Sequence, residues 1–311
     1  MNPEAERDLA RRPMRADFIS EVESFDETTG VARMRMQPDP RRYDKGERDG
    51  ETLYVDKYLR TAFTLDVMVA GAWAGVPSYS FQPRIESAID YAEARQSALT
   101  NEMSSGEYLP PTESPCHHHE IISRRNERGL GFLSVDICGA SAMRRKNPIA
   151  FDRAYELFTR ELGTVVGQFN GSILKTKGDG FIAFIDHPSF TNLCDHIVDM
   201  GLSLLILLHR SLNPTLVKAG MEPLSIRIGA DYGEALVRQL TIPSTGFVTH
   251  EVASDALNRA VKIEEACPPN QFWIGRCLYE LIHVKWLERA TETAFDGADI
   301  GMPDYKTYRM T

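Results

Sequence analysis

The alternation of apolar and polar residues divides the first third of the chain into segments of strand and helix period. Between residues 17 and 36 apolar residues recur at every second position on either side of turn residues 26–30, which predicts a β-hairpin. The stretch 53–73 is apolar but its period is mixed, and it supports no assignment. After Pro83, apolar residues at helical spacing predict a helix over 84–103.

The second half of the chain shows a clearer pattern of strands and helices. The tight turn Gly178-Asp179-Gly180 between two short apolar runs predicts a second hairpin. The order strand, helix, strand, strand, helix, strand predicts an α+β fold, a ferredoxin-like βαββαβ palm with extra strands. The predicted strands are 131–137, 172–177, 181–185, 224–231, 235–240 and 272–274, and the predicted helices are 148–170, 190–212, 255–266 and 276–282.

A linker signal separates the two halves. Residues 104–114 contain Ser-Ser-Gly and Pro-Pro, which are typical of a connection between domains. We therefore expect an N-terminal extension over residues 1–115, with a regulatory role, and a catalytic domain over residues 116–311. The run Cys116–His119 lies at this junction. Adjacent histidines in an extended loop point in different directions, so we interpret the run as linker and not as a zinc site.

Composition and charge exclude several classes of protein. The 311 residues are 42% hydrophobic and 25% charged, which is ordinary for a globular protein. The net charge of −9 argues against general binding to nucleic acid. Five cysteines without a C-x-x-C pair indicate reduced thiols and a cytoplasmic protein. The start of the chain lacks a signal-peptide pattern, and the most apolar stretch, 200–208, is short, so we expect a core helix and no stable membrane span.

Two aspartates are the main candidates for chemistry. Asp136 ends an apolar strand and Asp179 lies at the tip of the next hairpin, and in this order of elements the strands that carry them are neighbours. Two nearby carboxylates repel each other unless a cation lies between them, and Mg²⁺ or Mn²⁺ suits such a site. Taken singly, a helix cap and a turn residue would explain them. The small residues Gly139, Ala140 and Ser141 follow, and their backbone N–H groups could meet phosphate oxygens.

Four segments in this order resemble the class III nucleotidyl cyclases. They are FLSVDICGAS, LKTKGDGFIAF, IRIGADYGEALV and EVASDALNRAVKIEEA, within roughly residues 131–282. The resemblance implies a cyclase homology domain that forms a head-to-tail homodimer with two composite active sites. It further implies conversion of a nucleoside triphosphate to its 3′,5′-cyclic monophosphate and pyrophosphate.

The resemblance also implies roles for single residues. Asp136 and Asp179 match the metal-binding aspartates of the family, with the Ile137 carbonyl as a further ligand, and they would hold two divalent cations, Mn²⁺ or Mg²⁺. Lys175 and Glu251 match the two positions that read the base. In a homodimer, each site would use the metal ligands of one subunit and four residues of the other: Lys175, Glu251, Asn258 and Lys262.

The helix that follows Glu251 carries the residues implied in the reaction itself. Asn258 matches the asparagine that orients the ribose. Lys262 stands where the family usually has arginine, and it could neutralise developing charge without the bidentate fork. Two further positions depart from the family pattern. Ala140 replaces an aromatic residue, and Ile300 stands where a phosphate-binding lysine is expected.

Hydrogen-bonding logic does not select the base. A lysine donor and a glutamate acceptor suit adenine, cytosine and uracil alike. The chain resembles the pyrimidine cyclases of Pycsar antiphage defence. In that family, cyclic UMP or cyclic CMP activates a separate effector. From this resemblance we expect UTP as the substrate. The alternatives are an adenylate cyclase that makes cyclic AMP and a non-catalytic module that senses nucleotides. Lys262 and Ile300 favour the sensor, whereas the two aspartates and Asn258 argue against it.

Overall fold

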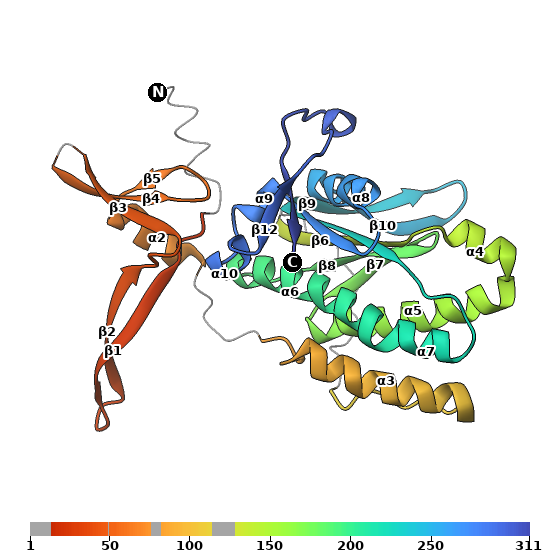
Figure 1. The fold of residues 1–311 in the computed structure, drawn as a ribbon. Coiled ribbons are helices and arrows are strands. Elements are labelled where there is room, and N and C mark those ends of the chain that lie inside the picture. The colour runs from red at the N-terminus through yellow and green to blue at the C-terminus, as the bar shows by residue number, and fades with distance from the viewer. Residues whose placement is uncertain (1–13, 49, 76–81, 114–127) are drawn as a thin grey trace.

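A mixed eight-stranded sheet forms the centre of the molecule (Figure 1). The computed structural model describes residues 14–48, 50–75, 82–113 and 128–311. The strands are hydrogen-bonded in the order β12-β13-β11-β9-β6-β8-β7, and β10 pairs with the far part of β9. Their bounds are β6 Arg128–Ile137, β7 Ser172–Lys177, β8 Gly180–Ile185, β9 Ile226–Ile242, β10 Phe247–Ala253, β11 Gln271–Gly275, β12 Ala290–Thr293 and β13 Thr307–Met310.

Helices cover the two faces of this sheet unequally. The larger hydrophobic core lies on one face and the smaller one lies under helix α8 (Asp255–Ala266) on the other face. The first face is covered by α5 (Pro148–Gln168), α6 (Phe190–Leu207), a π-helical turn (Leu208–Leu212) and α7 (Asn213–Lys218), and α3 (Ala88–Ser105) packs outside them. The shorter helices are α4 (Ala140–Lys146), α9 (Arg276–Tyr279), α10 (Val284–Leu287) and a 3₁₀ turn (Ala298–Ile300), and α8 spans Asp255–Ala266.

Strand β6 shows how the sheet assigns its side chains to the two faces. Leu133 and Val135 enter the larger core, and Phe132 enters the smaller core under α8. Because side chains alternate along a strand, Ser134 and Asp136 point to the α8 side. The end of strand β6 therefore carries the Asp136 carboxylate on the face of the sheet that α8 covers.

The predicted fold class is confirmed, and most predicted elements are present. The helix predicted from Pro148 begins at that residue, with the Asn147 side chain accepting the Ala150 N–H at 3.1 Å. The N-terminal hairpin consists of β1 (Phe18–Asp26) and β2 (Val31–Pro38). The unassigned stretch 53–73 contributes to β4 (Glu51–Asp56), β5 (Ala62–Phe63) and α2 (Leu65–Gly75), and β4 also pairs with β3 (Tyr43–Arg48).

Several predicted boundaries were wrong, each for a local reason. The two strands predicted over 224–240 are one strand, β9, and Gly233 does not interrupt it. A Cβ at Gly233 would lie 3.0 Å from the Ala256 side chain, so this glycine allows α8 to pack closely. Helix α3 starts at Ala88, because Ser87 caps it by accepting the Asp90 N–H. Helix α9 ends at Tyr279 and does not reach residue 282. Strand β10 was not predicted.

A buried ionic cluster attaches the N-terminal strands to the rest of the molecule. Arg42 is fully buried, and it donates to Asp17 at 2.9 Å and to Asp56 at 2.7 Å. Asp17 also accepts the backbone N–H of Val284 at 3.0 Å. Burial opposes ionisation of Asp17, but Arg15 and Arg42 prevail and lower the pKa of its carboxyl. Charged groups therefore hold this junction together.

Helix α3 lies before the expected domain boundary at residue 115, yet it packs against the helices of the sheet. Its Leu99 belongs to the larger core, and its Arg95 forms a buried ion pair with Glu161 of α5 at 2.8 Å. The division into 1–115 and 116–311 stays a prediction. The Cys116–His119 run lies outside the described residues.

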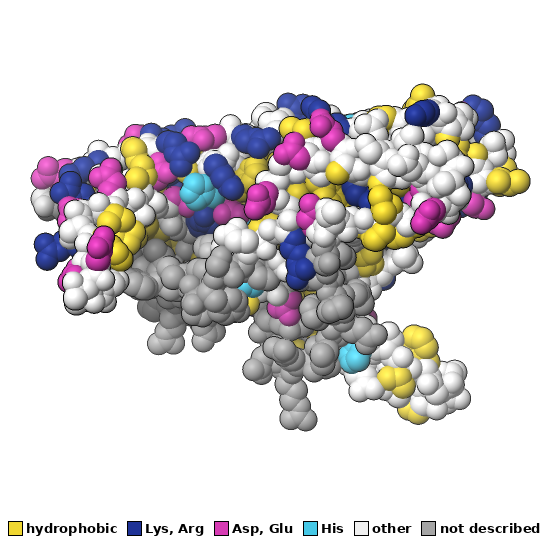
Figure 2. Space-filling view, turned by 90° about the horizontal axis from the view of Figure 1, so that it is seen from below, with side chains coloured by type: hydrophobic (Ala, Val, Ile, Leu, Met, Phe, Trp, Pro, Cys, Tyr) yellow, Lys and Arg dark blue, Asp and Glu magenta, His cyan; other side chains and the backbone are white. Residues whose placement is uncertain are grey.

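One described helical stretch, Phe190–Lys218, is long and apolar enough to cross a membrane, and its most apolar 18-residue window has a mean hydropathy of 1.4. However, 61% of its most apolar window is buried inside the protein, as in the core helix of a soluble domain. On the surface seen in Figure 2, acidic and basic side chains are interspersed. The described residues on that face form no single-sign patch of the kind that attracts a polyanion.

Candidate active site

The turn that carries Asp179 lies against the end of β6, where Asp136 is found. Val135 of β6 is paired with Phe181 of β8. A Cβ on Gly180 would lie 1.9 Å from the Val135 carbonyl oxygen and 2.9 Å from the Asp136 Cα, so only glycine fits there. The sheet register therefore brings the two aspartates to the same corner of the molecule.

A guanidinium group contacts each of these carboxylates. Arg227 Nη2 donates to Asp136 Oδ2 at 2.9 Å, and Arg144 Nη2 donates to Asp179 Oδ1 at 2.9 Å. Each carboxylate thus already has a cationic partner in the fold. Two carboxylates that attract cations at one corner are a donor set suited to a hard divalent ion.

Glu264 of α8 is fully buried and lies at the centre of a polar cluster beside Asp136. We define the Glu264 cluster as Glu264, Ser134, Lys177 and Arg227. Ser134 Oγ and Lys177 Nζ donate to Glu264 Oε2 at 3.1 and 3.0 Å. Arg227 Nε lies 2.7 Å from Glu264 Oε1, an ion pair by distance although the N–H is poorly aligned. Burial raises the pKa of Glu264, while Lys177 acts in the opposite direction.

The small residues after Asp136 form a tight turn into α4. Gly139 adopts a left-handed backbone with φ 72° and caps α4, and its carbonyl accepts the N–H of Ala142. Ala140 is buried and Ser141 is exposed. The backbone of Ile137 is paired with Ile226 of β9 at the end of the sheet. These residues therefore lie directly beside Asp136 in the structure.

The other sequence-derived candidates do not all lie near the aspartates. Asn258 and Lys262 share the outer side of α8, and Lys262 Nζ contacts Glu265 at 2.9 Å. Lys175 is exposed on the edge strand β7. Glu251 of β10 forms an exposed ion pair with Arg238 at 2.8 Å. Arg238 is eleven residues beyond Arg227 on β9, about 36 Å along the strand. One chain does not bring Glu251 to Asp136.

Four residues at this corner were absent from the sequence-based list: Arg144, Lys177, Arg227 and Glu264. Three of them stood in the segments that carried the resemblance: Lys177 in LKTKGD, Arg227 in IRIGAD and Glu264 in VKIEEA. Glu264 faces the sheet because it follows Ala260, another buried residue of α8, by four positions. An acidic residue on the apolar side of an amphipathic helix was the available signal.

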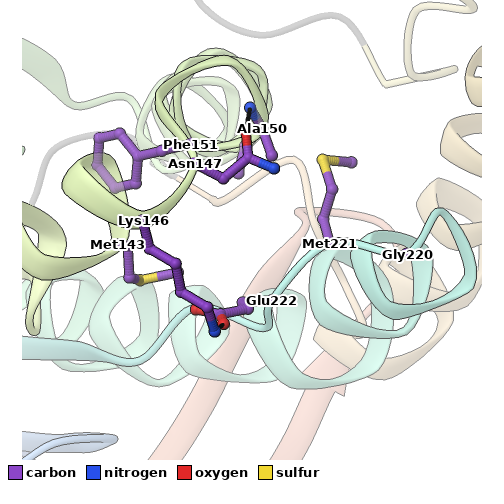
Figure 3. A pocket seen from close by; sticks show the side chains of 9 residues that line it. Met143, Lys146, Asn147, Ala150, Phe151, Gly220, Met221 and Glu222 are labelled. Atoms are coloured by element: carbon purple, nitrogen blue, oxygen red, sulfur yellow. Dashed lines mark hydrogen bonds and ion pairs between the residues drawn. The ribbon is translucent and has the colours of Figure 1, made fainter.

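A pocket of about 270 Å³ is lined by residues of α4, α5 and the segment after α7 (Figure 3). It opens between the α4–α5 junction and the segment after α7. An ion pair between Lys146 and Glu222 lies at one side, and Met143, Phe151 and Met221 provide apolar lining. None of the sequence-derived site residues lines it, so we do not assign the nucleotide to this pocket.

Comparison with solved structures identifies the fold. The adenylyl cyclase CyaB from P. aeruginosa superposes with a TM-score of 0.52 at 19% identity, over 60% of this chain and 95% of that one. The guanylate cyclase domain of RhGC from Catenaria anguillulae in complex with GTP gives 0.50 at 17%, covering 60% and 98%. The catalytic core of a rhodopsin-guanylyl cyclase with converted specificity, in complex with ATPαS, gives 0.51 at 17%, covering 60% and 97%.

No protein-family model matches the chain, and the search of curated proteins finds no match. At these identities the structural likeness shows the fold alone. The chain has the fold of a class III cyclase catalytic domain, with segments beyond the shared part.

Proposed function

We propose that the chain is a metal-dependent nucleotidyl cyclase that converts a nucleoside triphosphate to its 3′,5′-cyclic monophosphate and pyrophosphate. The observation that carries the proposal is the placement of Asp136 and Asp179 at one corner of a cyclase fold, each in contact with a cationic group. Two carboxylates in this position match the donor set that a triphosphate enzyme needs for divalent ions.

Asp136 and Asp179, with the Ile137 carbonyl, would hold two Mn²⁺ or Mg²⁺ ions. Bound there, such ions would lower the pKa of the ribose 3′-hydroxyl and neutralise charge on the phosphates. In the reaction, the 3′-oxygen forms a bond to the α-phosphorus. The bond from that phosphorus to the bridging oxygen breaks, pyrophosphate leaves, and the hydroxyl proton passes to solvent.

The remaining residues would bind and orient the substrate. The turn of Gly139, Ala140 and Ser141 would offer backbone N–H groups to phosphate oxygens. Asn258 would orient the ribose and Lys262 would neutralise charge at the α-phosphate. The separation of Glu251 from Asp136 along β9 supports a homodimer in which the base and the metals are held by different subunits.

The finer assignment is a pyrimidine substrate. We propose UTP, with cyclic UMP as a second messenger that acts on a separate effector in antiviral defence, in the cytoplasm. The sequence resemblance to the pyrimidine cyclases supports this choice. Lys175 on β7 and Glu251 on β10 would read the base as donor and acceptor.

The direct test is to incubate the full chain with ATP, GTP, CTP or UTP and Mn²⁺, and to identify products by mass spectrometry. We expect cyclic UMP as the main product. Cyclic AMP as the dominant product would contradict the pyrimidine assignment but not the cyclase. No product from any nucleotide, with metal-dependent nucleotide binding retained, would instead favour the sensor.

A further inference from the structure

The two arginines at the aspartate corner are held in different ways. Arg144 is 47% exposed; it pairs with Asp179, and its guanidinium lies over the Phe151 ring, 4.7 Å from the ring centroid. The Arg227 side chain is 30% exposed and uses all three of its nitrogens. Nη2 contacts Asp136, Nε contacts Glu264 and Nη1 donates to the backbone carbonyl of Glu265 at 3.1 Å.

Helix α8 fixes the position of Arg227. Glu264 is fully buried and is held by Ser134 of β6 and Lys177 of β7. The backbone of α8 also meets β9 directly, because a Cβ on Gly229 would lie 2.3 Å from the Glu264 nitrogen. Three strands and one helix therefore share a single carboxylate. The Arg227 guanidinium contacts α8 at two points, the Glu264 carboxylate and the Glu265 carbonyl. It therefore cannot move away from Asp136 without breaking its contact with the buried Glu264.

The contact with Asp136 also selects which oxygen stays available. Arg227 donates to Oδ2, and among the described residues no hydrogen bond reaches Oδ1. A hydrogen bond to one carboxylate oxygen orients the group so that the other can bind a cation. Among the described residues, Arg144 has no second carboxylate partner of this kind, so an incoming ion could displace it from Asp179 while its contact with Phe151 remains.

We infer that Arg227 and Glu264 are positioning residues that orient Asp136 toward a divalent cation. The inference rests on the proposed function and adds a support for the metal site. Arg144, by contrast, is a displaceable cation. The two arginines should therefore differ in their effects on metal affinity, even though each contacts one aspartate.

The test measures Mn²⁺ affinity of the full chain without nucleotide, from the electron paramagnetic resonance signal of free Mn²⁺. We expect Arg227→Ala and Glu264→Gln to bind Mn²⁺ about 10- to 100-fold more weakly than the unmodified chain. Arg227→Lys should also bind more weakly, because a single ammonium cannot span Asp136 and Glu264. Arg144→Ala is the matched comparison, and it should bind Mn²⁺ no more weakly than the unmodified chain.

A kinetic readout separates positioning from general loss of structure. In Arg227→Lys, the Mn²⁺ concentration for half-maximal turnover should rise, and turnover should recover at saturating Mn²⁺. Because Glu264→Gln could destabilise the fold, thermal unfolding is recorded for every variant, and Arg227→Lys decides if Glu264→Gln does not fold. Turnover that stays low at saturating Mn²⁺ would overturn the positioning role.

Two further outcomes distinguish this inference from the proposed function. If Arg227→Ala binds Mn²⁺ as tightly as Arg144→Ala while Asp136→Ala binds weakly, the positioning role is wrong and the metal site stands. If Asp136→Ala itself leaves Mn²⁺ affinity unchanged, the metal assignment fails and the inference fails with it.

Discussion

The two ends of strand β9 meet their surroundings in different ways. Near its start, Arg227 joins Asp136 to the buried Glu264, so strand, helix and neighbouring strands share one polar cluster. Toward its other end, Arg238 pairs with Glu251 on β10, and both side chains are largely exposed. At the first end, the charged groups are paired with one another within the same chain. The second end presents its charges to solvent.

This difference bears on how an active site could be divided between subunits. Metal ligands need fixed geometry, which buried supporting contacts provide. Base-reading groups on an exposed extension can instead meet a substrate held mainly by another chain. The structure of a single chain therefore supports the composite site proposed from the sequence, in which Asp136 and Glu251 of different subunits cooperate.

Removing either proposed metal ligand should have the greatest effect on turnover. Asp136→Ala and Asp179→Ala should each reduce turnover by about a thousandfold or more, because the ions supply several kcal/mol of stabilisation in the transition state. Turnover is measured with Mn²⁺, and circular dichroism checks the fold. Appreciable turnover in both variants would exclude the metal assignment.

Loss of a buried ion pair in the middle of β9 should lower the free energy of unfolding. Asp231 is fully buried and is ion-paired with Arg259 of α8. Burial raises the pKa of the Asp231 carboxyl and Arg259 opposes the shift. Arg259→Ala should lower the free energy of unfolding by about 3–5 kcal/mol, because it leaves a buried carboxylate without its cation. Urea unfolding measures this.

A matched variant controls for the loss of an arginine alone. Arg276 forms an ion pair with Glu280 at the surface, one helical turn apart. Arg276→Ala should change the free energy of unfolding by less than about 1 kcal/mol. An equal loss in both variants would show that burial of Asp231 does not determine the effect.

Mixing two inactive variants tests the division of the site between subunits. In a mixed dimer of Asp136→Ala and Asn258→Ala chains, one composite site keeps both residues. Random exchange of subunits should then restore about a quarter of the unmodified activity, since half of the dimers carry one of two sites. Activity no higher than that of either variant alone, with exchange shown by tagged chains, would mean that the site lies within one chain.

The exposed end of β9 should show the smallest effect on stability. Glu251→Gln should change the free energy of unfolding by less than about 1 kcal/mol, because its pair with Arg238 is solvated. We expect a rise in KM for UTP, since the side chain would read the base. An unchanged KM for UTP would remove Glu251 from the site.

The sequence by itself determined the fold class, most helices and the joint choice of Asp136 and Asp179. These depend on local patterns, namely apolar periodicity, turn residues and ordered motifs, which one chain displays without knowledge of its contacts. Boundaries that depend on packing were less accurate. Gly233 indicated a break in the strand, but its purpose is the close approach of α8.

The tertiary structure alone decided which charges meet. Arg227 and Glu264 are 37 positions apart, and Arg144 and Asp179 are 35 apart, so nothing local pairs them. The contact of Arg227 with Glu264 arises because the packing of α8 on Gly229 of β9 brings these two charges together where Glu264 is buried. A buried charge needs a partner, and only the folded chain shows which one it has.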